Sequence, residues 1–501
     1  MRLALIGLGG TLWLFIVLMA VRGRGRRATV DRAARHLGRR RDLSALTPSG
    51  SQASAQRLAG GIPGPLLGLT VSGRVPLRAS WEDTHVAIWG PRTGKTTSLV
   101  IPDVLDAPGA VLTTSNRRDV LDATRLARAQ AGEVWVFDPQ AVAGQEPTWW
   151  WNPLEGIDTI TQARRLAGHF AASSRAPGAH RDAFFDPAGE DLLANMLLAA
   201  ARSGDTLLTA YEWLSDPIDR TPQRILEQTG HALPARAVGG VIAAPDKLRG
   251  SVYATALQMA ACLVEPAVTR WVTPPNSPLR RFDADVFAHS TDTLYALSRE
   301  GEGSAAPLIS ALCAAVLEAA ERLATRSPAG RLPVPLLAPL DEAANVCRIR
   351  ALPDLYSHYG GRGIILKTIL QSWSQGVEVW GREGMAKLWS AANIKTYGGG
   401  VAEAEFLDTL SRLLGDHDVP TQTTSYSRGT RSVSRATRRD RVLDVAQLGA
   451  MPRGRAVLIA SGLPPTLIEP VPWYAGRHAA IVRQSLAAHD PAACATEGRP
   501  A

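Results

Sequence analysis

Residues 89–97 read Trp-Gly-Pro-Arg-Thr-Gly-Lys-Thr-Thr, and these residue types suit the binding of a triphosphate. They follow the apolar run from His85 to Ile88, so a strand should enter the segment and a helix should leave it. Backbone N–H groups in such a turn, and the N-terminus of such a helix, favour anions. Lys95 would reach the β- and γ-phosphates of ATP, and the Thr96 hydroxyl would ligate Mg²⁺. The pattern predicts a phosphate-binding loop made of Gly90, Pro91, Arg92, Thr93, Gly94, Lys95, Thr96 and Thr97.

One position departs from the usual motif. Its first glycine would fall on Trp89, and the chain has glycine one place later, at Gly90. The alternative interpretation is a chance Gly-Lys-Thr in a surface loop. A second motif at a suitable distance favours the phosphate loop.

That second motif is the apolar run from Val334 to Leu340, which ends in Asp341 and Glu342. A buried strand that delivers two carboxylates to a phosphate loop has this pattern. Asp341 would hold the Mg²⁺ ion, and Glu342 would polarise the attacking water. Pro335 and Pro339 are unusual in a strand because proline removes a ladder donor, so a helix N-terminus capped by Asp341 is the alternative.

The elements that position these residues follow a long uncharged segment. Residues 3–21 carry no charge and would nearly span a hydrocarbon layer of about 30 Å. Nine arginines lie between positions 22 and 41, whereas only Arg2 precedes the segment. The positive-inside rule therefore predicts a single-pass anchor over 1–22 in the cytoplasmic membrane, with the rest of the chain in the cytoplasm. A cleaved signal peptide is the alternative, although no small-residue cleavage site precedes the arginines.

The remaining chain of 501 residues, 45% of them hydrophobic, can bury more than one core. Short apolar runs alternate with helical patterns from His85 onward, which is typical of a covered, largely parallel sheet. From about Thr159 to Arg281 the rhythm becomes purely helical. We therefore expect an α/β nucleotide-binding domain that is interrupted by an inserted helical domain. The expected segments are a basic linker (23–80), a first nucleotide-binding part (81–158), an all-α insertion (159–281), a second part (282–484) and a tail (485–501).

Three further features carry weaker signals. The four cysteines show no metal-ligand spacing and imply no disulfide. The run Trp149 to Trp151 could stack on bases, but packing at a domain junction is the commoner use. The formal net charge is +9, and part of the excess lies in an arginine cluster between 428 and 441. That cluster could contact nucleic acid, although we slightly favour a solvated loop.

Several motifs together resemble the VirD4/TraG/TraD coupling ATPases of type IV secretion and conjugation. They are Gly-Pro-Arg-Thr-Gly-Lys-Thr at 90–96, Asp-Pro at 138–139, Leu-Asp-Glu-Ala-Ala-Asn at 340–345 and Leu-Gln-Ser at 370–372. The similarity extends from about residue 84 to 484 and is greatest to actinobacterial members with a TraM-recognition or TraG-like C-terminal domain. It implies a RecA-like motor, usually hexameric, that binds ATP and Mg²⁺ and is anchored in the membrane by its N-terminus.

The resemblance also implies roles for single residues. Gln371 is similar to the family's polar γ-phosphate sensor, whereas an ordinary strand-end glutamine is the alternative. Arg362 lies where relatives place an arginine that could reach a neighbouring subunit's nucleotide, although it could equally be a surface arginine. With Lys95 and Glu342, these residues form the expected catalytic set, while Thr96 and Asp341 are the expected metal ligands. Many relatives have two membrane spans where this chain has one predicted span.

The function that these features predict is a membrane-anchored motor that recruits DNA, or a relaxase bound to DNA, and passes it to a type IV secretion channel. A septal DNA translocase and a motor for protein secretion belong to the same broad class. A membrane scaffold that does not hydrolyse nucleotide is the alternative from a different class, and Trp89 and Pro339 are the residues that favour it.

Overall fold

The computed structural model describes residues 28–173, 182–276, 278–299, 301, 305–427 and 430–491, with only the backbone described for 423–427 and 430–433. The anchor predicted for residues 1–22 lies outside the described residues. Within the described ranges, no helix is both long enough and apolar enough to cross a membrane.

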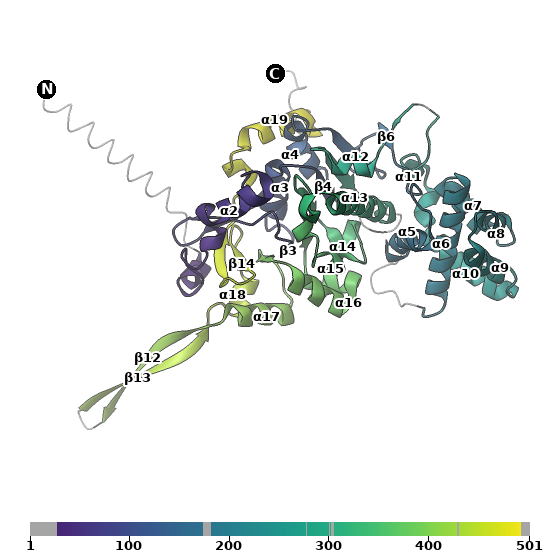
Figure 1. Cartoon of the computed structure of the whole chain (residues 1–501). Helices are drawn as coiled ribbons and strands as arrows, with labels where there is room; N and C mark the ends of the chain where they lie inside the picture. Colours follow the sequence, from purple (N-terminus) through teal and green to yellow (C-terminus); the bar gives the residue numbers. More distant parts are fainter. Residues whose placement is uncertain are drawn as a thin grey trace, which may run out of the picture.

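The centre of the molecule is a mixed sheet of eleven strands (Figure 1), in the order β2-β1-β15-β14-β11-β3-β10-β9-β4-β8-β5. Seven neighbouring strands, from β11 to β5, are parallel, and the other four continue the sheet in antiparallel pairing. The α/β class expected from the alternating pattern is confirmed. The strands are β1 (Leu66–Thr70), β2 (Pro76–Arg78), β3 (His85–Ile88), β4 (Val111–Ser115), β5 (Val134–Phe137), β8 (Thr293–Leu297), β9 (Leu336–Leu340), β10 (Ile364–Leu370), β11 (Ile394–Tyr397), β14 (Ala456–Ala460) and β15 (Thr466–Glu469).

Both faces of the parallel part are covered, which explains why its strands are mostly apolar and buried. Val86 and Ile88 of β3 enter one core, and Ala87 enters the core on the opposite face. All residues of β4, β8, β9 and β10 are buried. One face is covered by α2 (Pro48–Ala59), η3 (Thr96–Val100), α3 (Ile101–Asp106) and α4 (Asp119–Arg128), and α19 (Ala479–His489) packs on α4. The other face is covered by α12 (Ala284–Ala288), α13 (Ala306–Arg326), α14 (Ala343–Val346), α15 (Leu352–Leu355), α16 (Trp373–Ala391), α17 (Ala404–Leu414) and α18 (Val445–Gly449).

A helical unit projects from one end of the sheet, on the right of Figure 1. A two-stranded ribbon precedes and follows it, formed by β6 (Trp149–Trp150) and β7 (Arg280–Arg281). Trp149 and Trp151 are buried in this region, and Trp149 contacts Trp135, Phe137 and Trp271 in an aromatic cluster. The packing interpretation is therefore confirmed for Trp149 and Trp151, while Trp150 is half-buried. The helices of the unit are α5 (Ile160–Ser173), α6 (Phe185–Ser203), α7 (Leu207–Ser215), α8 (Thr221–Gln228), α9 (Ala232–Ile242), α10 (Asp246–Met259), η4 (Ala261–Val264) and α11 (Pro266–Thr269).

The linker expected over 23–80 is wrong for residues 28–80, because they are part of the sheet domain. The short helix η1 (Thr29–His36) contacts β15, and β1 pairs with β15. Leu77 is fully buried, and the indole of Trp81 donates to the Ile62 carbonyl oxygen at 3.0 Å. Many of the buried positions in this segment are small residues, such as Ala33, Ala34, Ser51 and Ala55, so its sequence shows only a patchy apolar pattern.

The arginine-rich segment before residue 442 is not a loop. It is one strand of a hairpin formed by β12 (Asp416–Ser427) and β13 (Thr430–Arg441), which pair only with each other and extend away from the body (Figure 1). The residues of both strands are almost all polar or charged. The sequence therefore lacks the alternation of apolar and polar positions that predicts a strand, so these strands were not expected.

The folded N-terminal segment leads to a prediction about truncation. A chain that begins at residue 81 loses several buried leucines, each worth about 1.5–3 kcal/mol, and leaves β15 as an unpaired edge. Since whole domains are stable by only about 5–15 kcal/mol, we expect it to aggregate or to unfold without cooperativity. A chain that begins at residue 28 should unfold cooperatively when followed by circular dichroism. Equal melting temperatures for the two chains would contradict the assignment of residues 28–80 to the sheet domain.

Candidate functional site

The predicted site residues other than Arg362 lie where three adjacent parallel strands end. The order of these strands is β3, β10, β9, so the loop after β3, Gln371 after β10 and the acids after β9 meet at one edge. Carboxyl ends of parallel strands in an open sheet are the usual place for a ligand.

The loop of residues 89–97 has the tight backbone that the motif predicts. A side chain at Gly90 would collide with the Gly400 carbonyl oxygen, because its Cβ atom would lie only 2.0 Å from that oxygen, so only glycine fits there. Gly94 has φ +94°, a conformation that other residues rarely adopt. The hydroxyls of Thr93 and Thr97 donate to the carbonyls of Gly90 and Gly94, at 2.6 and 3.0 Å. These bonds fix the loop at the start of the helix formed by η3 and α3.

Trp89 does not face the loop. Its ring is buried, its indole donates to the Thr396 hydroxyl at 3.2 Å, and a side chain at Gly398 would collide with the ring. The Trp89 backbone N–H continues the pairing of β3 by donating to the Leu370 carbonyl oxygen at 2.9 Å. The residue that replaces the expected first glycine is thus part of the core below the loop, and the close backbone approach is made by Gly90.

Lys95 lies between two carboxylates. Its ammonium forms ion pairs with Glu342 and with Asp341, the second at 3.2 Å. The Gln371 amide donates to both Glu342 oxygens, at 2.7 and 2.8 Å, and the Asn345 amide donates to one of them at 3.2 Å. The structure thus brings Lys95, Asp341, Glu342 and Gln371 into one hydrogen-bonded cluster, while their catalytic roles stay predictions.

The acidic motif follows a true strand despite its prolines. Pro339 cannot donate to the ladder, and the Thr113 hydroxyl of β4 donates to its carbonyl oxygen at 3.1 Å. The Thr114 hydroxyl binds the Asp341 carbonyl oxygen at 2.7 Å. The backbone of Glu342 has the left-handed conformation, with φ 54°, which is rare outside glycine and costs of order 1–3 kcal/mol. This backbone turn directs the Glu342 carboxylate toward Lys95.

Burial governs the proton affinities in the cluster. It raises the pKa of Asp341 to about 6, although Lys95 opposes the shift. Burial by itself would lower the pKa of Lys95, but the charges of Asp341 and Glu342 outweigh it and raise that pKa. Burial also raises the pKa of Asp119, a carboxyl at the start of α4 whose charge interacts with Lys95 and Asp341. Asp119 has no sequence signature, because only the fold brings it near the loop.

Arg362 lies at the opposite, amino-terminal ends of the parallel strands. It precedes β10, whereas Gln371 follows that strand, so about 20 Å of strand separates them. Its guanidinium binds Glu321 of α13, whose carboxylate also accepts from the Tyr359 hydroxyl at 3.1 Å. Arg362 is therefore not part of the site of its own subunit, and action on a neighbouring subunit stays a prediction.

Behind the loop, α3 is tied to β10 by an ion pair that is almost completely buried. Lys367 of β10 binds Asp103 of α3, and both side chains are at most 3% exposed. His85 lies beside Lys367 in the register of β3 and β10, and burial holds its pKa well below its ordinary value. Removing one partner of such a pair is strongly unfavourable, so the helix after the phosphate loop is locked to the strand that carries Gln371.

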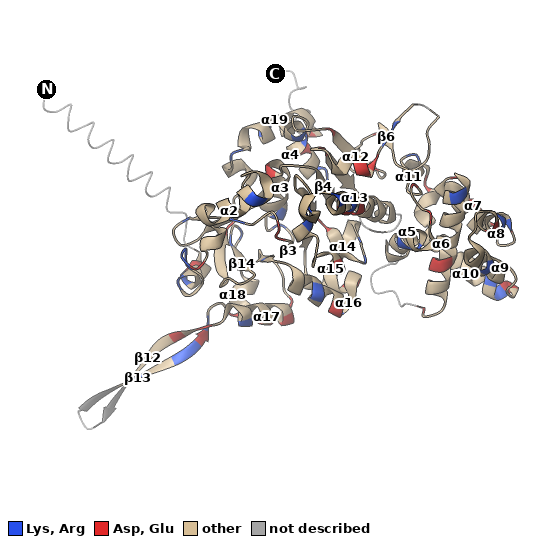
Figure 2. Ribbon diagram, in the orientation of Figure 1, with Lys and Arg blue, Asp and Glu red and all other residues tan. Residues whose placement is uncertain are grey.

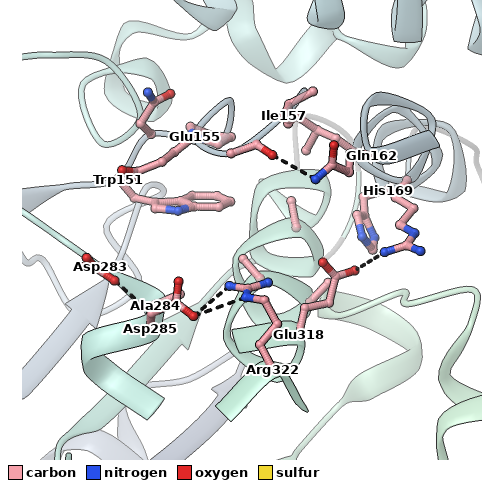
Figure 3. A pocket seen from close by; sticks show the side chains of 18 residues that line it. Trp151, Glu155, Ile157, Gln162, His169, Asp283, Ala284, Asp285, Glu318 and Arg322 are labelled. Atoms are coloured by element: carbon pink, nitrogen blue, oxygen red, sulfur yellow. Dashed lines mark hydrogen bonds and ion pairs between the residues drawn. The ribbon is translucent and has the colours of Figure 1, made fainter. Parts of the chain in front are cut away.

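A separate cavity of about 380 Å³ lies where the helical unit joins the sheet domain (Figure 3). Its walls come from α5, α12, α13 and the segment after β6, and none of the predicted site residues lines it. Two ion pairs lie in its wall, Arg322 with Asp285 at 2.9 Å and Arg165 with Glu318 at 3.5 Å. The cavity is a feature of the junction rather than of the site around Lys95.

The raised pKa of Asp341 leads to a prediction about stability. A carboxyl with a folded pKa of about 6 and an ordinary pKa near 3.8 makes the native state less stable as pH rises between these values. Asp341→Asn should therefore raise the free energy of unfolding at pH 7.5 by up to about 3 kcal/mol, and the gain should vanish near pH 4. Urea unfolding at both pH values measures this difference. Asp408→Asn, which removes a half-buried carboxylate paired with Arg412, is the control, and a gain at pH 7.5 no larger than that of the control would contradict the shift.

Part of the chain matches the model of a known protein family. Residues 335–453 match the family model described as the TraM recognition site of TraD and TraG. No curated protein is similar enough to the chain to count as a match. The matched segment contains Asp341, Glu342 and Gln371, and it ends at Arg453.

Solved structures share the fold at low sequence identity. A bacterial conjugative coupling protein, TrwBdeltaN70 in complex with sulphate, matches with a TM-score of 0.59 and 17% identity, covering 83% of this chain and 92% of that chain. The plasmid coupling protein TrwB in complex with ADP and Mg²⁺ matches with a TM-score of 0.57 and 17% identity, covering 80% and 89%. TrwB in complex with a non-hydrolysable GTP analogue matches with a TM-score of 0.56 and 16% identity, covering 80% of this chain and 89% of that chain. Residues 335–453 thus match a TraD and TraG family model, and most of the chain has the fold of solved coupling proteins, in agreement with the motifs at 90–96, 340–345 and 370–372.

Proposed function

We propose that the chain is a membrane-anchored type IV coupling protein, an ATP-hydrolysing motor that recruits DNA, or a relaxase bound to DNA, and passes it to a secretion channel. The observation that carries the proposal is the cluster of Lys95, Asp341, Glu342 and Gln371 beside a phosphate loop. A scaffold has no need of a buried lysine between two carboxylates, because such an arrangement costs desolvation free energy.

The cluster suits a nucleotide with Mg²⁺. Oxygens of a bound triphosphate would accept hydrogen bonds from the Lys95 ammonium, and Glu342 would then be released from its ion pair with Lys95. Asp341 and the hydroxyl of Thr96 would hold the Mg²⁺ ion, which when bound neutralises charge on the phosphates. Gln371 and Asn345 already orient the Glu342 carboxylate, so once released it can take the proton of an attacking water. Relatives of the same fold have been solved with ADP and Mg²⁺ and with nucleotide analogues, which supports this assignment.

Assembly into a ring, a hexamer in our proposal, would give Arg362 a role. Arg362 lies at the amino-terminal ends of the parallel strands, opposite the site, where it would approach a neighbouring subunit rather than the phosphate loop of its own subunit. There its guanidinium would neutralise charge on the dispersed γ-phosphoryl group, after exchanging Glu321 for the phosphate. The anchor, with 1–22 in the cytoplasmic membrane, would keep such a ring beside the channel.

The hairpin of β12 and β13 is the part of the molecule that we assign to DNA. Residues 419–438 contain four arginines and no acidic residue. Arg435 and Thr437 are exposed on one face of β13, and Figure 2 shows basic residues on the described part of the strand. An isolated two-stranded hairpin is at best marginally stable, and a basic one is favoured by contact with phosphates. Closer to the body, Arg439 and Arg441 bind Asp418 and Asp416, which hold the base of the hairpin together.

The hydrolysis step is tested by Glu342→Gln. The variant should bind ATP but turn it over about 10²–10⁴-fold more slowly, since an amide cannot accept the proton of water. Steady-state ATPase activity of the full chain in detergent, with and without single-stranded DNA, measures the loss. Glu383→Gln, on an exposed face of α16, should leave the rate unchanged. Full activity of Glu342→Gln, or no turnover by the wild type with DNA present, would disprove the motor.

The DNA assignment is tested by removing the hairpin. Because Asp418 and Arg439 are paired in register, residues 419–438 can be replaced by Asn-Gly, which forms a two-residue turn. We expect unchanged ATPase activity without DNA, loss of its stimulation by DNA and a smaller dependence of DNA affinity on salt. A second variant, with the four arginines changed to glutamine, keeps the backbone and tests charge alone. DNA affinity equal to that of the wild type in both variants would place the DNA contact elsewhere.

A further inference from the structure

An arginine that is far away in the sequence lies beside the phosphate loop of the same subunit. A Cβ atom placed on Gly94 would lie 3.6 Å from Nε of Arg453, comparable with its 3.5 Å distance from the hydroxyl of Thr97 within the loop itself. Arg453 follows α18 and precedes β14. The guanidinium of this residue therefore lies over the turn that comes immediately before Lys95.

The backbone around Arg453 is fixed on both sides. Before it, Met451 is buried and packs so closely on Gly399 that a side chain at this glycine would meet Met451 Cβ at 2.8 Å. After it, Arg455 binds Asp31 of η1 through two hydrogen bonds, at 2.7 and 3.1 Å. Gly399 in turn accepts a hydrogen bond from the Gly90 N–H at 2.9 Å. The turn that carries Arg453 and the phosphate loop are thus joined through the glycines at 398–400.

The charge of Arg453 remains available. Lys95 is neutralised by Asp341 and Glu342, but Arg453 forms no ion pair with any carboxylate of the described ranges, and its side chain is exposed. A guanidinium has five donors in a planar fork that suits phosphate oxygens, and an unpaired one need not break an existing ion pair to reach them. Its position differs from that of Arg362, which is held by Glu321 at the opposite edge of the sheet.

We infer that Arg453 binds the phosphate chain of the nucleotide from within the same subunit, as a second cation beside Lys95. The inference rests on the proposed function, because it names a further residue of the same nucleotide site. It also gives the turn before β14 a direct contact with the nucleotide. Loss of a phosphate on hydrolysis would then alter a contact of the segment that follows the hairpin and α18.

Binding of tripolyphosphate, which has the phosphates of ATP without its base and sugar, tests the contact in the full chain in detergent. Arg453→Ala should weaken binding about 10- to 100-fold, as the loss of a charge-assisted hydrogen bond does, with an unchanged melting temperature. Arg453→Lys should recover part of the affinity, because the charge is kept and the fork is lost. Arg412→Ala, an exposed arginine of α17 paired with Asp408, is the matched control and should bind like the wild type.

Two outcomes separate this inference from the proposed function. If the wild type binds tripolyphosphate and ATP and Arg453→Ala binds both within twofold of it, Arg453 does not contact the phosphates and the inference is wrong, while the proposed function stands. If the wild type binds neither, the proposed function itself fails. Action within one subunit is tested by mixing Arg453→Ala with Glu342→Gln subunits. Recovery of ATPase activity in the mixture would show action between subunits and overturn the inference.

Discussion

The site depends on one physical constraint, which is that buried charges must be paired. Lys95, Asp341 and Glu342 have side chains at most 13% exposed. Lys95 and Glu342 keep their charges there because they are paired, whereas the pairing of Asp341 with Lys95 offsets only part of the cost of burying its charge. Their charges come from two strands that are not adjacent, β3 and β9, with β10 between them supplying Gln371. The order of the strands therefore has to be correct before the charges can pair.

The same constraint continues behind the loop. Lys367 and Asp103 form a second buried pair that fixes α3 against β10, so the helix after the phosphate loop and the strand before Gln371 cannot shift independently. Glu342 adds a strained backbone at the point where the acidic motif leaves β9. Strain of this kind persists when surrounding contacts over-determine it, and here the bonds from Lys95, Gln371 and Asn345 do so. The carboxylate is thereby held ready, and a bound phosphate chain would compete with it for Lys95.

The C-terminal part of the matched family segment has two separate functions in our interpretation. Its hairpin extends outward, and we assign to it the contact with phosphates of DNA, since four arginines lie in the sequence between 419 and 438. Its end returns to the sheet and places Arg453 beside Gly94, at the phosphates of the nucleotide. One stretch of chain, from β12 to β14, thus connects the two kinds of phosphate that a DNA motor has to handle. This connection offers a direct path between nucleotide state and DNA contact.

The local parts of the site and the class of the fold could be predicted from the sequence. Gly-Lys-Thr after an apolar run, and Asp-Glu after another, identify their elements because turn chemistry and burial act over a few residues. Sequence also indicated most strands of the parallel sheet, since strands covered on both faces are continuously apolar. It failed for residues 28–80, where many buried positions are small residues, and for the hairpin, where polar residues form strands without an apolar pattern. Only the tertiary structure decided that Trp89 is part of the core, that Asp119 and Arg453 lie by the loop and that Arg362 does not. Those outcomes depend on strand order and on contacts between residues hundreds of positions apart, which no local pattern encodes.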